Sequence, residues 1–163
     1  MRVSVAFGIA AVLASIGIAG AQEFKPPPMK DGFWETHSIE SKQGKTLFET
    51  TVKMCQSKDI ANSMQANADE LRKKNGCTST VSQPSANTYV EESRCSKGPN
   101  AGSVTKVIYT YQADVSSHTE MHVNAGADET VMIMDTKYVG SCPADVKPGD
   151  MVMSDGKKIS ASH

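Results

Sequence analysis

The chain contains 163 residues, a length that accommodates one ordinary domain and hardly two. Its 17 Lys and Arg residues nearly balance its 18 Asp and Glu residues, which excludes a strongly basic nucleic-acid-binding platform and a polyacidic tail. The four cysteines, nine methionines and single tryptophan are the compositional features that call for an interpretation.

Residues 1–21 have the composition of a secretory signal peptide. Arg2 supplies a positive charge, an apolar segment follows, and Ala19-Gly20-Ala21 fits an A-x-A cleavage motif. The alternative is an N-terminal membrane anchor, but the apolar run is short for a bilayer span and lacks a basic stop-transfer flank. We therefore expect an exported chain, in the periplasm or alternatively the extracellular space, with no membrane span after cleavage.

The following segments predict a hairpin and one helix. Residues 22–28 include three consecutive prolines and predict an extended lead-in to a single domain at residues 29–142. Alternating apolar and polar side chains indicate strands at residues 32–39 and 46–55. Ser57 is a suitable N-cap for a helix that ends at Gly76. The apolar residues of this helix recur with helical spacing, at Ile60, Met64, Ala68 and Leu71.

Five further segments alternate with a period of two residues between short polar turns. They cover residues 78–83, 88–94, 104–112, 117–123 and 130–139. With the first hairpin, they predict a mainly β domain: an antiparallel meander or partly closed barrel of about seven strands with one amphipathic helix. Residues 143–163 lack periodicity and predict a flexible C-terminal tail.

The four cysteines predict two disulfides, because thiols oxidise in exported proteins. If residues 84–87 close a hairpin, Cys77 lies opposite Cys95, and Cys55 and Cys142 remain for the second bridge. The alternative is a redox-active or zinc-binding set. It is disfavoured because no C-x-x-C pair occurs and no two cysteines lie closer than 18 positions.

Several short segments together carry a family resemblance. Besides the leader, they are Gly32-Phe33-Trp34-Glu35, Val52-Lys53-Met54-Cys55, Asn75-Gly76-Cys77 with its hairpin to Cys95, and Tyr138-Val139-Gly140-Ser141-Cys142. In these features the chain resembles the exported bacterial domain-of-unknown-function family 3617, over roughly residues 25–142. Asp31-Gly32 stands where relatives usually carry Pro-Gly. The family has no established activity, so the resemblance implies no catalytic residue and no cofactor.

One short segment suggests a metal site. On a strand, His118, Glu120 and His122 share one face, and two histidines with one carboxylate are a set that binds Cu or Zn. On a helix, the two histidines would instead sit four residues apart, but the glutamate is misplaced for the H-E-x-x-H motif. The alternative is an exposed polar strand face without a metal. Neighbouring side chains on one face of a strand lie about 6.5 to 7 Å apart, which is wide for joint coordination of a single ion.

Methionine admits three interpretations. Thioethers select Cu(I), and Met132 with Met134, like Met151 with Met153, shares a strand face, so a copper site is one of them. Adaptable core filling is the second, and a flexible face for an apolar ligand is the third. The candidate residues for such a ligand face are Trp34, Met54, Met121, Met132 and Met134.

The sequence contains no nucleophile elbow, Walker loop or dinucleotide-binding glycine loop, so we identify no catalytic residue. We expect a non-enzymatic binding or envelope-associated module without a cofactor. Its partner would be an apolar small molecule or a segment of an envelope protein, and not nucleic acid. The alternatives are a metal-binding module for Cu or Zn and a purely structural or protein-interaction domain.

Overall fold

Strands dominate the computed structural model, which describes residues 29–99, 101–126 and 128–160. In chain order, the elements are β1 (Gly32–Lys42), β2 (Lys45–Gln56), α1 (Lys58–Lys74), β3 (Cys77–Ser85), β4 (Thr88–Cys95), β5 (Val104–Gln112), β6 (Ser116–Ala125), β7 (Asp128–Gly140), β8 (Met151–Met153) and β9 (Lys158–Ile159). The predicted signal peptide and lead-in at residues 1–28 lie outside the described residues.

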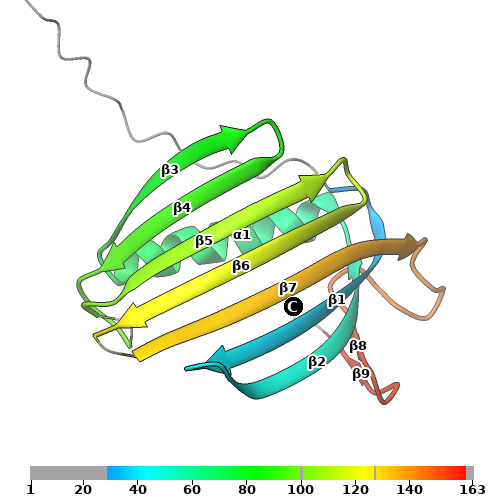
Figure 1. The fold of residues 1–163 in the computed structure, drawn as a ribbon. Coiled ribbons are helices and arrows are strands. Elements are labelled where there is room, and N and C mark those ends of the chain that lie inside the picture. The colour runs from blue at the N-terminus through cyan, green and yellow to red at the C-terminus, as the bar shows by residue number, and fades with distance from the viewer. Residues whose placement is uncertain (1–28, 100, 127, 161–163) are drawn as a thin grey trace, which may run out of the picture.

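The nine strands of the described residues belong to one open antiparallel sheet in the order β3-β4-β5-β6-β7-β1-β2-β8-β9 (Figure 1). Strands β3 to β7 form the predicted meander, and the β1–β2 hairpin pairs with the last meander strand. Gln43 and Gly44, both with positive φ, make the two-residue turn between β1 and β2. Such a turn matches the natural twist of paired strands, which fixes their register.

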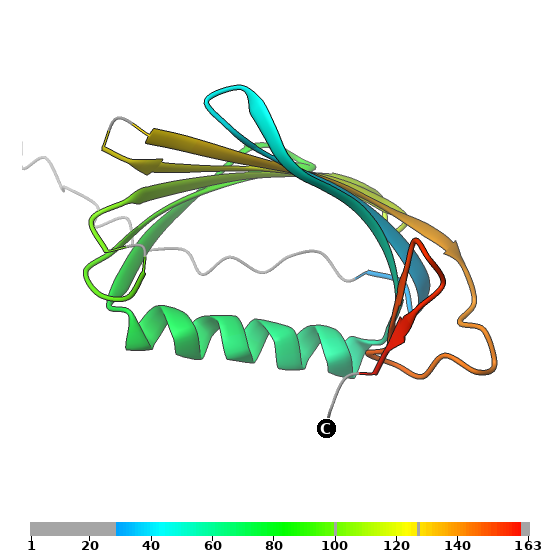
Figure 2. The same cartoon turned by 90° about the horizontal axis from the view of Figure 1, so that it is seen from below.

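Helix α1 lies on the concave side of the curved sheet and runs from the end of β2 to the start of β3 (Figure 2). The Ser57 side chain accepts a hydrogen bond from the Ile60 N–H, and basic residues occupy the last turn, where they complement the helix dipole. Gly76 has a φ of 58°, a value that favours glycine directly after a helix. Among the described residues, no helix is long and apolar enough to cross a membrane.

The structure confirms both predicted disulfides, and each lies close to one end of α1. Cys55, bonded to Cys142, precedes the N-cap, and Cys77, bonded to Cys95, follows the helix directly after Gly76. Backbone hydrogen bonds reinforce the second end, because the Lys97 N–H donates to the Asn75 carbonyl. Disulfides therefore cross-link the chain on both sides of the helix, at Cys55 to the segment after β7 and at Cys77 to the end of β4.

The structure corrects two predictions, the strand number and the C-terminal tail. The sheet has nine strands instead of about seven, because residues 143–160 fold back against β2 and supply β8 and β9. The Cys55 N–H donates to the Asp150 carbonyl, and the Gly149 N–H donates to the Cys55 carbonyl. Asp150 and Val146 are buried there, so this segment is an ordered part of the domain.

Candidate functional site

The five predicted ligand-face residues all lie on one face of the sheet. Directly paired residues of antiparallel strands point to the same side, and Trp34 pairs with both Met54 and Tyr138. Tyr138 shares its face with Met134 and Met132 along β7. Met132 in turn pairs with Met121 on β6. The register therefore brings together candidate residues from four strands.

This face is the concave one, which faces α1. Continuing across the sheet, Met121 pairs with Val107 and Val107 pairs with Glu91. The carboxylate of Glu91, only 4% exposed, lies 3.1 Å from the guanidinium of Arg72 on α1. Arg72 also binds Asp69 one turn earlier on the helix, at 3.1 Å. This ion pair connects the helix directly to the concave face of the sheet.

The helix and the concave face leave much of their apolar surface exposed. No described residue of α1 is buried, and Met64 and Leu71 are 54% and 58% exposed. On the concave face, Trp34 and Val107 are buried, whereas the methionines of the ligand face are only half-buried. A packed core buries such side chains almost completely. The concave face therefore presents accessible apolar surface beneath a helix.

Aromatic side chains lie toward opposite ends of this face. Trp34 packs edge-to-face against Tyr138 at 5.6 Å between ring centroids, and its Nε1–H donates to the Lys30 carbonyl at 2.8 Å. Across the sheet, Tyr111 stacks on Tyr109, with ring centroids 6.4 Å apart. Burial, followed by the nearby negative charge of Glu91, raises the pKa of Tyr109, so its hydroxyl stays protonated at neutral pH.

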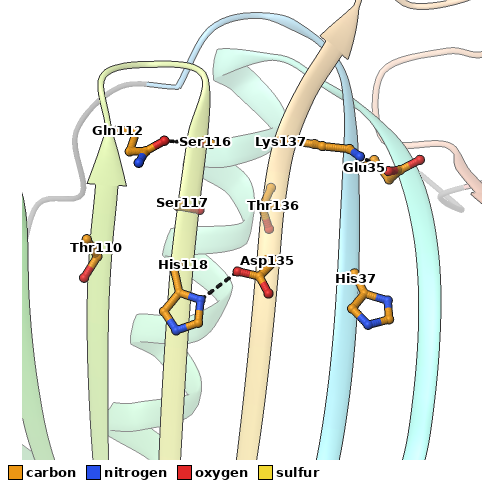
Figure 3. Close-up of a pocket in the computed structure, with 10 residues that line it drawn as sticks. All are labelled: Glu35, His37, Thr110, Gln112, Ser116, Ser117, His118, Asp135, Thr136 and Lys137. Carbon is orange, nitrogen blue, oxygen red and sulfur yellow. Dashed lines mark hydrogen bonds and ion pairs between the residues drawn. The ribbon is translucent and has the colours of Figure 1, made fainter.

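The convex face holds a groove of about 300 Å³ with polar lining residues (Figure 3). Residues of β1, β5, β6 and β7 line it, and at one end Glu35 lies between two lysines of neighbouring strands. Its carboxylate lies 2.8 Å from Lys137 and 3.3 Å from Lys53. The Lys137 and Lys53 ammonium groups lower the pKa of Glu35, with Lys137 contributing more.

The predicted metal-binding residues lie on the convex face, but they do not converge on one point. The Nε2 atoms of His118 and His122 lie 3.2 and 3.7 Å from different oxygens of Glu120. Their Nδ1 atoms lie 2.6 Å from Asp135 and 3.1 Å from Glu129. The described part of the chain contains no group of three or more His, Cys, Asp or Glu residues that could hold a metal ion.

These contacts give His118 two carboxylate neighbours. The hydrogen bond with Asp135, followed by the one with Glu120, raises the pKa of His118. Asp135 comes from β7, which pairs with β6 in the sheet. Sequence reasoning missed this partner, together with the Arg72–Glu91 pair and Lys137. No signal in one sequence shows which residues face each other across strands that are far apart in the chain.

Comparison with known proteins identifies a family. A family model described as "Protein of unknown function (DUF3617)" matches residues 29–142. No curated protein and no solved structure matches the chain.

Proposed function

We propose from the geometry that the chain, which belongs to the DUF3617 family, is a non-enzymatic exported module that binds an apolar small molecule. The description of this family assigns no function. The ligand would lie against the concave face, beneath α1. The partial exposure of apolar side chains on both the helix and the sheet carries this proposal. An apolar ligand would cover this surface and release the water from it.

The lining suits a ligand of variable shape. Met54, Met121, Met132 and Met134 have flexible, polarisable side chains that repack around different apolar groups. Trp34 and Tyr111 are buried aromatic residues that give the face rigid points. Arg72 neutralises the buried carboxylate of Glu91, which favours an uncharged ligand beside this pair.

The disulfides indicate an oxidising, non-cytoplasmic environment. Together with the predicted signal peptide, they support export to the periplasm.

A fluorescence titration with the neutral apolar dye N-phenyl-1-naphthylamine tests the proposal. We expect saturable binding that weakens at least about tenfold in Met134→Gln, because a polar amide then replaces a thioether in the contact surface. Ile133→Gln is the matched control. Ile133 is the adjacent residue of β7 and points to the convex face, where it pairs with Ile39. Equal weakening in both variants, or no saturable binding by the unmodified protein, would contradict the proposal.

Native mass spectrometry of protein purified from its own host complements the titration. The expected spectrum contains an additional mass that organic solvent removes without breaking the disulfides. A spectrum with only the unliganded mass argues against a resident ligand and favours the structural or protein-interaction alternative.

A further inference from the structure

Three methionines of the concave face lie close together and share a chemistry besides apolar contact. Met121 of β6 and Met132 of β7 are directly paired, and Met134 lies two residues further along β7 on the same face. We call Met121, Met132 and Met134 the methionine triangle. All three side chains are half-buried, so they are accessible to a small ion.

The spacing of the triangle suits joint coordination. Met121 and Met132, which are directly paired, have Cβ atoms about 4.5 to 5.5 Å apart. Met134 lies about 6.5 to 7 Å from Met132 along β7 and about 7 to 8 Å from Met121 on the diagonal. A methionine side chain has three rotatable bonds and can direct its sulfur sideways over these separations. The three thioethers can therefore approach one point above the sheet, which histidines four residues apart on a single strand cannot do.

The surroundings of the triangle favour a soft cation. Thioether sulfur is a neutral, soft ligand that selects Cu(I) over harder ions such as Mg²⁺ and Ca²⁺. Glu40 of β1 pairs with Met132 and adds a negative charge on the same face. Ser38 and Thr119, which pair with Met134, add small polar groups beside it. A monovalent cation would thus have three soft ligands and a nearby compensating carboxylate.

We propose that the methionine triangle is a binding site for a soft monovalent metal ion of the Cu(I) or Ag(I) class. The ion would coordinate the Sδ atoms of Met121, Met132 and Met134 on the concave face. This site is separate from the convex face of His118, Glu120 and His122. It needs no apolar ligand, so it stands or falls independently of the proposed function.

A second methionine group offers an internal comparison. Met54 of β2 pairs with Met151 of β8, and Met153 lies two residues further along β8 on the same face. Strand β8 has only three residues and lies near the edge of the sheet, whereas β6 and β7 are long central strands. A site needs a rigid frame to hold three ligands together. The triangle on β6 and β7 is therefore the site that we assign.

Titration with Ag(I) in chloride-free buffer tests the assignment on the disulfide-bonded mature chain. Ag(I) is the probe because it has the ligand preference of Cu(I) without its redox chemistry. We expect native mass spectrometry to show one tightly bound Ag(I), with the dissociation constant from calorimetry rising at least about a hundredfold in the triple variant Met121→Leu, Met132→Leu, Met134→Leu. Leucine keeps a similar volume and apolarity, so the fold should survive.

The controls separate the triangle from other methionines. The double variant Met54→Leu, Met151→Leu should bind Ag(I) as the unmodified chain does, and so should Met64→Leu on the exposed helix surface. Circular dichroism of each variant verifies the fold. Retention of tight Ag(I) binding by the triple variant, or its loss only in the Met54 and Met151 variant, overturns the assignment. Failure of N-phenyl-1-naphthylamine binding with Ag(I) binding intact would refute the proposed function alone.

Discussion

The ion pair between Arg72 of α1 and Glu91 of β4 predicts an asymmetric response to mutation. Arg72→Met removes the cation and leaves the Glu91 carboxylate, 4% exposed, without its compensating charge. Glu91→Gln removes the buried charge and leaves Arg72, which is 37% exposed and keeps Asp69 as a partner. The first change should therefore destabilise the protein more than the second.

The burial of the two side chains sets the expected loss of unfolding free energy in each variant. Removing one partner of a fully buried ion pair costs about 3 to 5 kcal/mol, and the partial exposure of Arg72 reduces this to about 2 to 3 kcal/mol for Arg72→Met. For Glu91→Gln we expect about 1 kcal/mol, the usual value for one weakened hydrogen bond. The double variant should cost no more than Arg72→Met alone, since no charge remains to be compensated.

Urea unfolding of the oxidised protein, followed by far-ultraviolet circular dichroism, measures these free energies. Lys73→Met is the matched control, because Lys73 is the next helix residue and is exposed; its cost should stay within about 0.5 kcal/mol. The reasoning fails if Arg72→Met costs no more than Glu91→Gln, or if the two single costs add up in the double variant. Either result would mean that the pair does not hold α1 against the sheet.

Three further predictions concern the disulfides, His118 and Gly32. Replacing Cys55 and Cys142 by serine should destabilise the protein by about 4 to 5 kcal/mol in urea unfolding, because this disulfide closes a loop of 87 residues. Replacing Cys77 and Cys95 by serine should cost about 3 kcal/mol, because that loop has 18 residues. Equal costs would contradict the chain-entropy explanation. Asp135→Asn should lower the pKa of His118 in an NMR titration, whereas Glu129→Gln, beside His122, should leave it unchanged. Because the pKa of His118 is raised on folding, the contribution of His118 to stability is complete below the ordinary histidine pKa and is lost as pH rises through the raised value. If Asp135→Asn leaves the His118 titration unchanged, that carboxylate is not the cause of the raised pKa. Gly32→Ala should lower the melting temperature by at least about 5 °C, since Gly32 has a φ of 146° and a Cβ there would lie 2.5 Å from the Tyr138 ring. The control Gly44→Ala should lower the melting temperature less, because a Cβ at Gly44 meets nothing within 4 Å.

Local patterns predicted the hairpins and the Cys77–Cys95 disulfide, which left Cys55 and Cys142 as the second pair. The alternation in residues 78–83 and 88–94 and the turn between them place Cys77 opposite Cys95, and the structure has this register. Period two also places Met132 and Met134 on one face. These predictions succeed because a hairpin register depends on residues close together in the chain.

The remaining contacts depend on pairings over long distances in the chain. Trp34 meets Tyr138 because β1 pairs with β7, and no local pattern indicates that pairing. Strand β8 has only three residues, too few for a detectable alternation, and it forms because backbone groups of Cys55 bind those of Gly149 and Asp150. The Arg72–Glu91 pair requires a helix to lie under a specific strand, which only the tertiary structure defines.

The two disulfides and the backbone together form a closed covalent ring. It runs from Cys55 through α1 to Cys77, crosses to Cys95, continues through β5, β6 and β7 to Cys142, and returns to Cys55. The helix forms one side of this ring and the three central strands form the other (Figure 2). A long molecule held between helix and sheet would thus be threaded through the ring. It could leave by sliding along its own length, and sideways release would require reduction of a disulfide.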